Sequence, residues 1–179
     1  SRTNRHGTYV QALILKGGPI LRVPTQIDNA NNAGSASFPN GGAAVVFGAG
    51  GGIGHALTNA LLANTSFQTV KCYGRSSEKP IDFEHETSVA RAVADAADAG
   101  DLRLVIDATG LLHEDDFGPE KTFKSLDPAW LARNFLVNAI GPAMIMKHVL
   151  PLLPKTGKSV FATLSARVGS IGDNRLGGW

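Results

Sequence analysis

Short apolar runs alternate with longer amphipathic segments from residue 43 onward. Five short apolar runs, each bounded by polar or glycine residues, predict buried strands at 43–47, 69–73, 81–83, 102–106 and 159–164. Apolar residues at helical spacing predict three helices, at 53–63, 87–99 and 127–150. Strands that alternate with helices are typical of an α/β domain built on a mostly parallel sheet.

A glycine-rich turn follows the first of these strands and precedes the first helix. It contains Gly48, Gly50, Gly51, Gly52, Ile53 and Gly54. Glycines let backbone amides approach phosphate oxygens closely, and the N-terminus of the following helix offers free N–H groups and a partial positive charge. The turn is therefore a candidate pyrophosphate site, with a tight or flexible turn as the alternative interpretation.

The spacing of these glycines resembles the fingerprint of the short-chain dehydrogenase/reductase family, G-x-x-x-G-x-G. The resemblance covers residues 41–179 and is strongest in 137–142 and 164–178, and the run 165–179 is similar to the C-factor-like branch. It implies a Rossmann-type, doubly wound parallel sheet with strand order 3-2-1-4-5, counting the predicted strands along the chain. We expect this fold to be incomplete at its C-terminal side, because the chain ends at Trp179, just before the position of the family's Tyr-x-x-x-Lys motif.

The second predicted strand runs into Gly74, Arg75 and Ser76. NAD-binding proteins place a carboxylate at this point, about 20 residues past the glycines, whereas an arginine there forms charge-assisted bonds with a 2′-phosphate. The sequence thus favours NADP(H), with NAD(H) possible and a solvated loop arginine as the alternative. The resemblance implies further cofactor contacts, and the added candidates are Asp82, Phe83, Ala108, Thr109 and Gly110.

The last predicted helix contains Asn138 and Pro142. Proline has no N–H and sterically opposes the carbonyl four residues earlier, so we expect a bend that leaves the Asn138 carbonyl facing water or a polar group. The resemblance implies that Asn138 is the active-site asparagine of a proton relay, and that Ser165 orients a substrate carbonyl, with Ser170 as second candidate. A simple proline kink and a turn serine are the alternatives.

The resemblance implies carbonyl reduction or alcohol oxidation by hydride transfer on a small substrate. In the family a tyrosine supplies the general acid, and Tyr9 and Tyr73 lie elsewhere in this sequence. We therefore expect the 179-residue chain to be inactive by itself. The alternative is a non-catalytic accessory subunit that keeps the fold within a larger assembly.

Residues 1–40 contain four basic residues and a single acidic one, and we expect an arm or linker before a domain at 41–179. The second half of the helix at 127–150 is apolar nearly all round, which predicts that another chain or a continuation covers it. The outer edge of the fifth strand is expected to need the same cover, since no later strand is present to pair with it. The partner is a second copy or another subunit.

Composition changes this picture little. A net charge of +2 and 43% hydrophobic residues give no case for nucleic acid, and we expect no membrane span. The single cysteine, Cys72, suits a reducing compartment, such as the cytoplasm or an organelle matrix, and not secretion. We expect its thiol to be packed inside a strand. His113, Asp115 and Asp116 lack a second ligand set, so we assign no metal.

Overall fold

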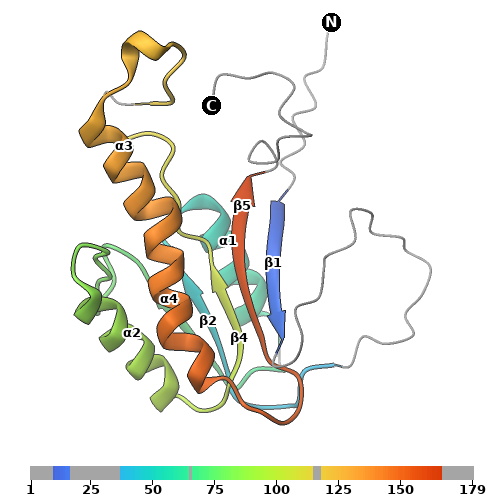
Figure 1. The fold of residues 1–179 in the computed structure, drawn as a ribbon. Helices are drawn as coiled ribbons and strands as arrows, with labels where there is room; N and C mark the ends of the chain where they lie inside the picture. Colours follow the sequence, from blue (N-terminus) through green and yellow to red (C-terminus); the bar gives the residue numbers. More distant parts are fainter. Residues whose placement is uncertain (1–9, 17–36, 65, 115–117, 167–179) are drawn as a thin grey trace, which may run out of the picture.

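The structure is a computed structural model, and it describes residues 10–16, 37–64, 66–114 and 118–166. A five-stranded sheet with the order β1-β5-β4-β2-β3 forms its centre (Figure 1). The strands are β1 (Val10–Lys16), β2 (Ala43–Phe47), β3 (Thr69–Tyr73), β4 (Leu102–Asp107) and β5 (Val160–Ala166). Four of them, β3, β2, β4 and β5, are parallel, as the alternating pattern predicts.

Helices cover the two faces of this sheet. On one face lies α1 (Gly52–Leu62), whose Leu61 packs with Ala44 and Val46 of β2. On the other face α2 (Glu86–Asp98) and α4 (Gly141–Val149) pack against Val45 and Phe47 of the same strand. Every residue of β2 is buried, because a central parallel strand needs apolar side chains on both faces.

Residues 81–83 form no strand, which corrects the third strand of the predicted order. The reason lies in Ser88 of α2, whose hydroxyl accepts from the Asp82 N–H and donates to the Asp82 carbonyl, both at 2.8 Å. The backbone groups that a ladder would use are therefore satisfied by one side chain. Ile81 is still buried, in the core cluster beside α2.

The outer edge of β5 is paired by the chain itself, so the expectation of an uncovered edge is wrong. β1 runs antiparallel to β5, with Val10 opposite Ala166 and Lys16 opposite Val160. The predicted arm at 1–40 therefore contributes one strand to the sheet, and the boundary at residue 41 stays a prediction.

The last long helix is built from three helical segments in succession. They are α3 (Pro128–Phe135), a π-helical turn η2 (Leu136–Ile140) and α4, and a short 3-10 turn, η3 (Leu150–Leu152), ends them (Figure 1). Asp127 caps the start, since its carboxylate accepts from the Trp130 N–H at 2.8 Å. The π turn ends two residues before Pro142, whose missing N–H interrupts regular α-helical bonding.

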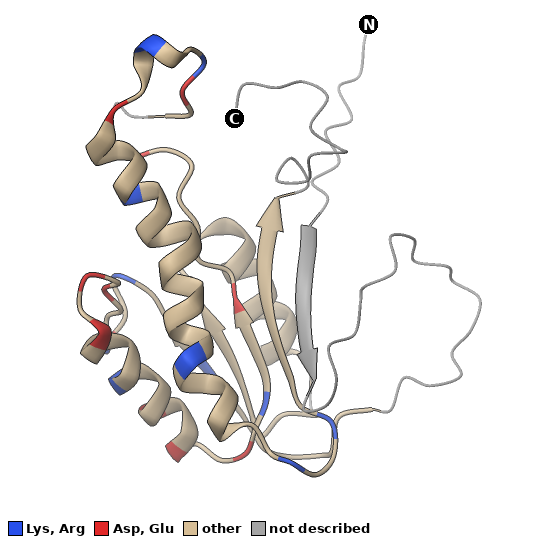
Figure 2. Cartoon of the chain, viewed as in Figure 1, with Lys and Arg blue, Asp and Glu red and all other residues tan. Residues whose placement is uncertain are grey.

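This helix leaves much of its apolar surface uncovered. Ile145 and Val149 are buried against the sheet, whereas Phe135, Ile140 and Leu150 are 65%, 47% and 37% exposed. In Figure 2, where Lys, Arg, Asp and Glu positions are coloured on the ribbon, most of this helix is tan. The segment Pro128–Leu152 is 25 residues long and contains an 18-residue window with a mean hydropathy of 1.4, so by length and composition alone it could cross a membrane. A core helix of a domain can have the same length and composition, so the expectation of no membrane span stays a prediction. The packing of this segment on β4 and β5 makes it a helix of the domain.

Candidate cofactor-binding site

A cavity of about 540 Å³ opens at the carboxyl ends of β2, β3 and β4. The chain passes from β2 to β3 on one side and then returns to β4 on the other, so the point between β2 and β4 is a topological switch point. Ligands of open α/β sheets bind in the crevice at this point. The lining residues of the cavity are Gly48, Ala49, Gly50, Gly51, Cys72, Tyr73, Gly74, Arg75, Ser76, Ser77, Ile81, Asp82, Phe83, Ala108, Thr109, Gly110, Leu111, Glu114, Arg133 and Val137.

Gly48 fixes the floor of the cavity. It has φ +80°, and an added Cβ would lie 2.6 Å from the Ala108 carbonyl carbon and oxygen. Its N–H donates to the Tyr73 carbonyl at 2.7 Å, and the Ala108 N–H donates to the Phe47 carbonyl at 2.9 Å. Three strand ends are thus tied together through a backbone approach that only glycine permits.

The start of α1 completes the glycine turn. Gly51 is the N-cap and makes no side-chain capping bond, so no capping side chain occupies the first amides of the helix. A Cβ at Gly50 would meet nothing within 4 Å, whereas one at Gly54 would lie 2.1 Å from the Gly48 carbonyl oxygen. Gly52 and Ile53, with Gly54, lie in the first turn of α1 and do not line the cavity.

The loop after β3 forms the far wall of the cavity. The Ser77 hydroxyl donates to the Gly74 carbonyl at 2.9 Å and accepts from the Gly74 N–H at 3.2 Å, which orders the turn that presents Arg75 and Ser76. Asp82 accepts from the Glu84 N–H, and His85 Nδ1 lies 2.8 Å from its other oxygen. The hydrogen bond to His85 holds the pKa of Asp82 below its ordinary value.

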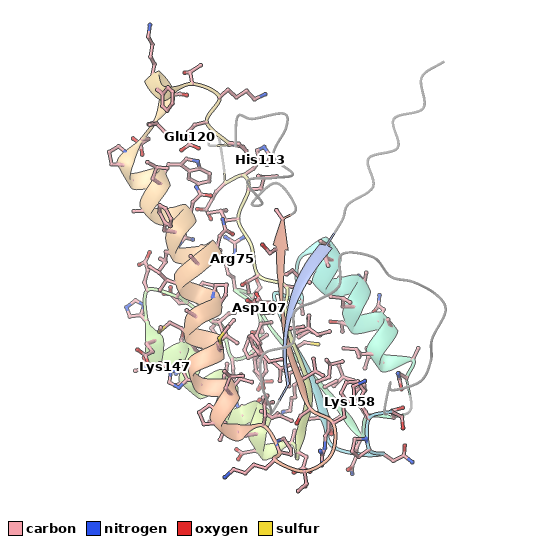
Figure 3. All side chains as sticks on the ribbon, turned by 45° about the vertical axis from the view of Figure 1, so that its right-hand side comes forward. Arg75, Asp107, His113, Glu120, Lys147 and Lys158 are labelled. Carbon is pink, nitrogen blue, oxygen red and sulfur yellow. The ribbon has the colours of Figure 1, made fainter. Side chains whose placement is uncertain are left out.

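Arg75 reaches across the cavity to a carboxylate that the sequence pattern did not identify. Its Nη1 donates to Glu114 Oε1 at 3.0 Å. Glu114 is also held by Arg133 of α3, whose Nε donates to Oε2 at 3.1 Å. Figure 3 shows Arg75 and Asp107 toward the carboxyl ends of the strands, away from Lys158.

Asp107 is a buried carboxylate at the end of β4. It accepts from the Thr109 N–H at 3.0 Å, from the Thr109 hydroxyl at 2.6 Å and from the Thr163 hydroxyl at 2.9 Å. Burial raises its pKa, and the bonds from the two threonines oppose that shift. Asp107 therefore joins β4 to β5 and orders Thr109, while Ala108 and Gly110 beside it line the cavity.

The two candidate catalytic residues lie outside this lining. Asn138 makes a pair of bonds to Leu111, since its Oδ1 accepts from the Leu111 N–H at 2.7 Å and its Nδ2 donates to the Leu111 carbonyl at 2.8 Å. Asn138 thus anchors the segment that follows Gly110. Ser165 is exposed near the end of β5, and Ser170 lies outside the described residues.

Further residues of the cavity were not identified from the sequence. Cys72 is exposed and lines the cavity, which corrects the expectation of a packed thiol, because its strand β3 lies at the edge of the sheet. Tyr73 is buried and donates to Asp95 Oδ2 at 2.6 Å. Burial first, and Asp95 second, raise the pKa of Tyr73 far above its ordinary value, so this phenol is not poised for acid–base work.

The fold defines a Rossmann-type domain with a glycine-lined cavity at its switch point. No protein-family model matches the chain. A curated relative, 1-hydroxy-2-glutathionyl-2-methyl-3-butene dehydrogenase of Rhodococcus sp. (strain AD45), is 29% identical over 144 residues, which are 75% of this chain. The chain spans 60% of the length of that relative.

Solved structures share the fold. Sniffer of Caenorhabditis elegans, described as a carbonyl reductase, matches with a TM-score of 0.66 and 23% identity over 77% of this chain and 69% of its own. A carbonyl reductase from chicken fatty liver, bound to NADPH, gives a TM-score of 0.61 and 18% identity over 77% and 62%. A short chain dehydrogenase from Burkholderia cenocepacia in complex with NADP gives 0.52 and 27% over 63% and 47%.

The chain is thus similar to a dehydrogenase from Rhodococcus and to a short chain dehydrogenase from Burkholderia cenocepacia. The two carbonyl reductase structures establish the same α/β fold at lower identity. The finer assignment to the C-factor-like branch stays a prediction.

Gly48→Ala should lower the stability of the domain by several kcal/mol, because the new Cβ would overlap the backbone at Ala108 at a positive φ. Gly50→Ala is the matched control, since a Cβ there meets nothing within 4 Å. Urea unfolding followed by circular dichroism measures both variants. A Gly48 variant as stable as the Gly50 variant would contradict the close packing described here.

Asp107→Asn should remove a pH dependence of stability. The folded pKa of Asp107 is raised, so its contribution to stability is fully present below its ordinary pKa of 3.8 and is lost as the pH rises through the folded value. Asparagine keeps an acceptor for Thr109 and carries no charge to bury. The Tm difference between variant and wild type should therefore grow in favour of the variant from about pH 4 to about pH 7.

Thermal unfolding at several pH values provides the measurement for Asp107. Glu78→Gln, which removes one charge from an exposed loop position, serves as the control for the change in net charge. A Tm difference that stays constant over this range, or that shrinks as the pH rises, would show that the buried carboxylate is not the titrating group.

Proposed function

We propose that the chain is the cofactor-binding part of an NADP(H)-dependent short-chain dehydrogenase/reductase that reduces a small carbonyl compound or oxidises the alcohol. The observation that carries this is the cavity at the switch point, with a glycine turn at one wall and Arg75 at the other. Support comes from the Burkholderia short chain dehydrogenase and the chicken carbonyl reductase, which were solved with NADP and NADPH.

The cavity residues have separate tasks in this proposal. Gly50, Gly51 and the start of α1 receive the pyrophosphate, because the two glycines carry no Cβ and the segment lies at a helix N-terminus. The Gly51 N–H donates to the Gly48 carbonyl at 3.1 Å, so the donors to the phosphate are the Gly50 N–H and the first amides of α1. Arg75 binds the 2′-phosphate, and Asp82 with Phe83 lies beside the adenine end. Thr109 and Gly110 line the nicotinamide end, where the bound cofactor supplies the hydride.

In this proposal the role of the Asn138 side chain is to hold the loop that contains Leu111. By clamping Leu111, it fixes the segment 108–111 against the cavity. Pro142 leaves the carbonyl of Asn138 without its α-helical donor, which favours the proposed water-linked relay. Ser165 remains the proposed carbonyl-orienting serine at the end of β5. The general acid would have to be supplied from outside the described residues.

A non-catalytic accessory subunit is the second candidate function. The buried Tyr73, which is not poised as an acid, is consistent with it. Turnover distinguishes the two functions: NADPH oxidation with a panel of small aldehydes and ketones, measured on the whole native protein, occurs only in the enzyme. Reversible binding of NADPH without turnover would favour the accessory subunit.

Arg75→Ala should weaken binding of NADP(H) by about 1.5–3 kcal/mol and leave binding of NAD(H) nearly unchanged, because only NADP(H) carries the 2′-phosphate. Isothermal titration calorimetry with both cofactors measures this. Arg91→Ala removes the same charge from an exposed position on α2 and is the control. Equal losses for NADP(H) and NAD(H) would contradict the assignment of Arg75.

We also propose that another chain, or a continuation of this one, covers the apolar side of the helix at Pro128–Leu152. Phe135 and Ile140 are large and well exposed, and a helix in this setting is normally buried on more than one side. The partner is a second copy or a different subunit, and the substrate is a small molecule.

The 179-residue chain expressed by itself should therefore sediment as an oligomer or aggregate in analytical ultracentrifugation. Replacing Phe135 and Ile140 together by glutamate should shift the distribution to smaller species. Phe123→Glu is the control, because Phe123 is 94% exposed in η1 (Phe123–Ser125), outside this helix. A stable wild-type monomer with a cooperative unfolding transition would overturn this proposal.

A further inference from the structure

Glu114 occupies an unusual position between two guanidinium groups at the cavity wall. Oε1 of Glu114 accepts from Arg75 at 3.0 Å and from Arg133 Nη2 at 3.4 Å, and Oε2 accepts from Arg133 Nε at 3.1 Å. All three residues line the same cavity. Two arginines that converge in this way form a site suited to an anion, and here a carboxylate of the chain itself occupies it.

The two arginines hold Glu114 unequally. Arg133 of α3 donates two hydrogen bonds to the Glu114 carboxylate. Hydrogen bonding from Arg133 is the main reason that the pKa of Glu114 is lowered. Arg75 makes one contact, and its side chain is 80% exposed. The carboxylate is therefore fixed to α3, while Arg75 reaches it from the loop after β3 by a bond that water screens strongly.

We propose that Glu114 is a specificity-determining residue for the nucleotide, because it competes with the 2′-phosphate of NADP(H) for the guanidinium of Arg75. This inference rests on the proposed function of the cavity as an NADP(H) site. NADP(H) must either displace Glu114 from Arg75 or bind beside a fixed negative charge. NAD(H) has a free 2′-hydroxyl in the same place and meets neither penalty.

Electrostatic repulsion predicts that Glu114 weakens the binding of the 2′-phosphate. A phosphate bound to one edge of Arg75 would carry nearly two negative charges close to a carboxylate bound to the other edge. Arg133 offsets part of that repulsion without removing it. The preference for NADP(H) over NAD(H) is therefore smaller than Arg75 would give in the absence of Glu114. The chain accordingly keeps some affinity for NAD(H).

Isothermal titration calorimetry on the full chain, in the assembly that it forms, tests this with three probes: NADP+, NAD+ and 2′,5′-ADP. Glu114→Gln should tighten NADP+ and 2′,5′-ADP by roughly three- to tenfold at low salt and change NAD+ by less than about twofold. Glu114→Ala repeats the test without a side-chain amide. Glu84→Gln is the control, since Glu84 also faces Arg133, at 3.7 Å, and is not a lining residue of the cavity.

In an Arg75→Ala background, Glu114→Gln should no longer change the affinity for NADP+, because the group under competition is gone. Unchanged or weaker NADP+ binding in the Glu114 variants overturns the inference, as does an equal gain for NAD+. Those results leave the proposed function intact if Arg75→Ala still weakens NADP+. A wild-type chain that binds neither dinucleotide overturns the proposed function and this inference together.

Discussion

The approach of the Gly48 backbone to the chain after β4 is the constraint on which the site depends. A side chain at Gly48 would meet Ala108 at 2.6 Å, and one at Gly54 would meet the Gly48 carbonyl at 2.1 Å. The two glycines therefore set how closely β2, β4 and α1 converge. Their convergence creates a cavity whose floor is backbone and whose wall is a helix N-terminus, a combination suited to phosphate.

Two carboxylates at this cavity, those of Asp107 and Glu114, differ in how deeply they are buried. The buried carboxylate of Asp107 is satisfied entirely by Thr109 and Thr163, and it serves the geometry of the strand ends. Farther out, Arg75 and Glu114 form a pair that remains accessible to a ligand. Burial thus separates a structural carboxylate from one in a position to influence which nucleotide binds, although both side chains are acidic.

The strand and helix pattern predicted most of the fold, because apolar runs and helical spacing report burial directly. The pattern was wrong where backbone bonding is satisfied by other means. Residues 81–83 have the composition of a strand, yet the Ser88 hydroxyl replaces the ladder. β1 lies in a segment interpreted as an arm, because its pairing with β5 joins distant parts of the sequence. Cys72 belongs to a correctly predicted strand, but its exposure depends on that strand lying at the edge.

The sequence by itself determined the glycine turn, the start of the last helix near residue 127 and the break before Pro142, because each follows from the local chemistry of one or a few neighbouring residues. Only the tertiary structure decided which side chains share the cavity. Glu114 and Arg75 are 39 positions apart and come from loops after different strands, so no local pattern could pair them. Long-range contacts of this kind follow from the order of strands in the sheet, which brings the carboxyl ends of β2, β3 and β4 to one edge.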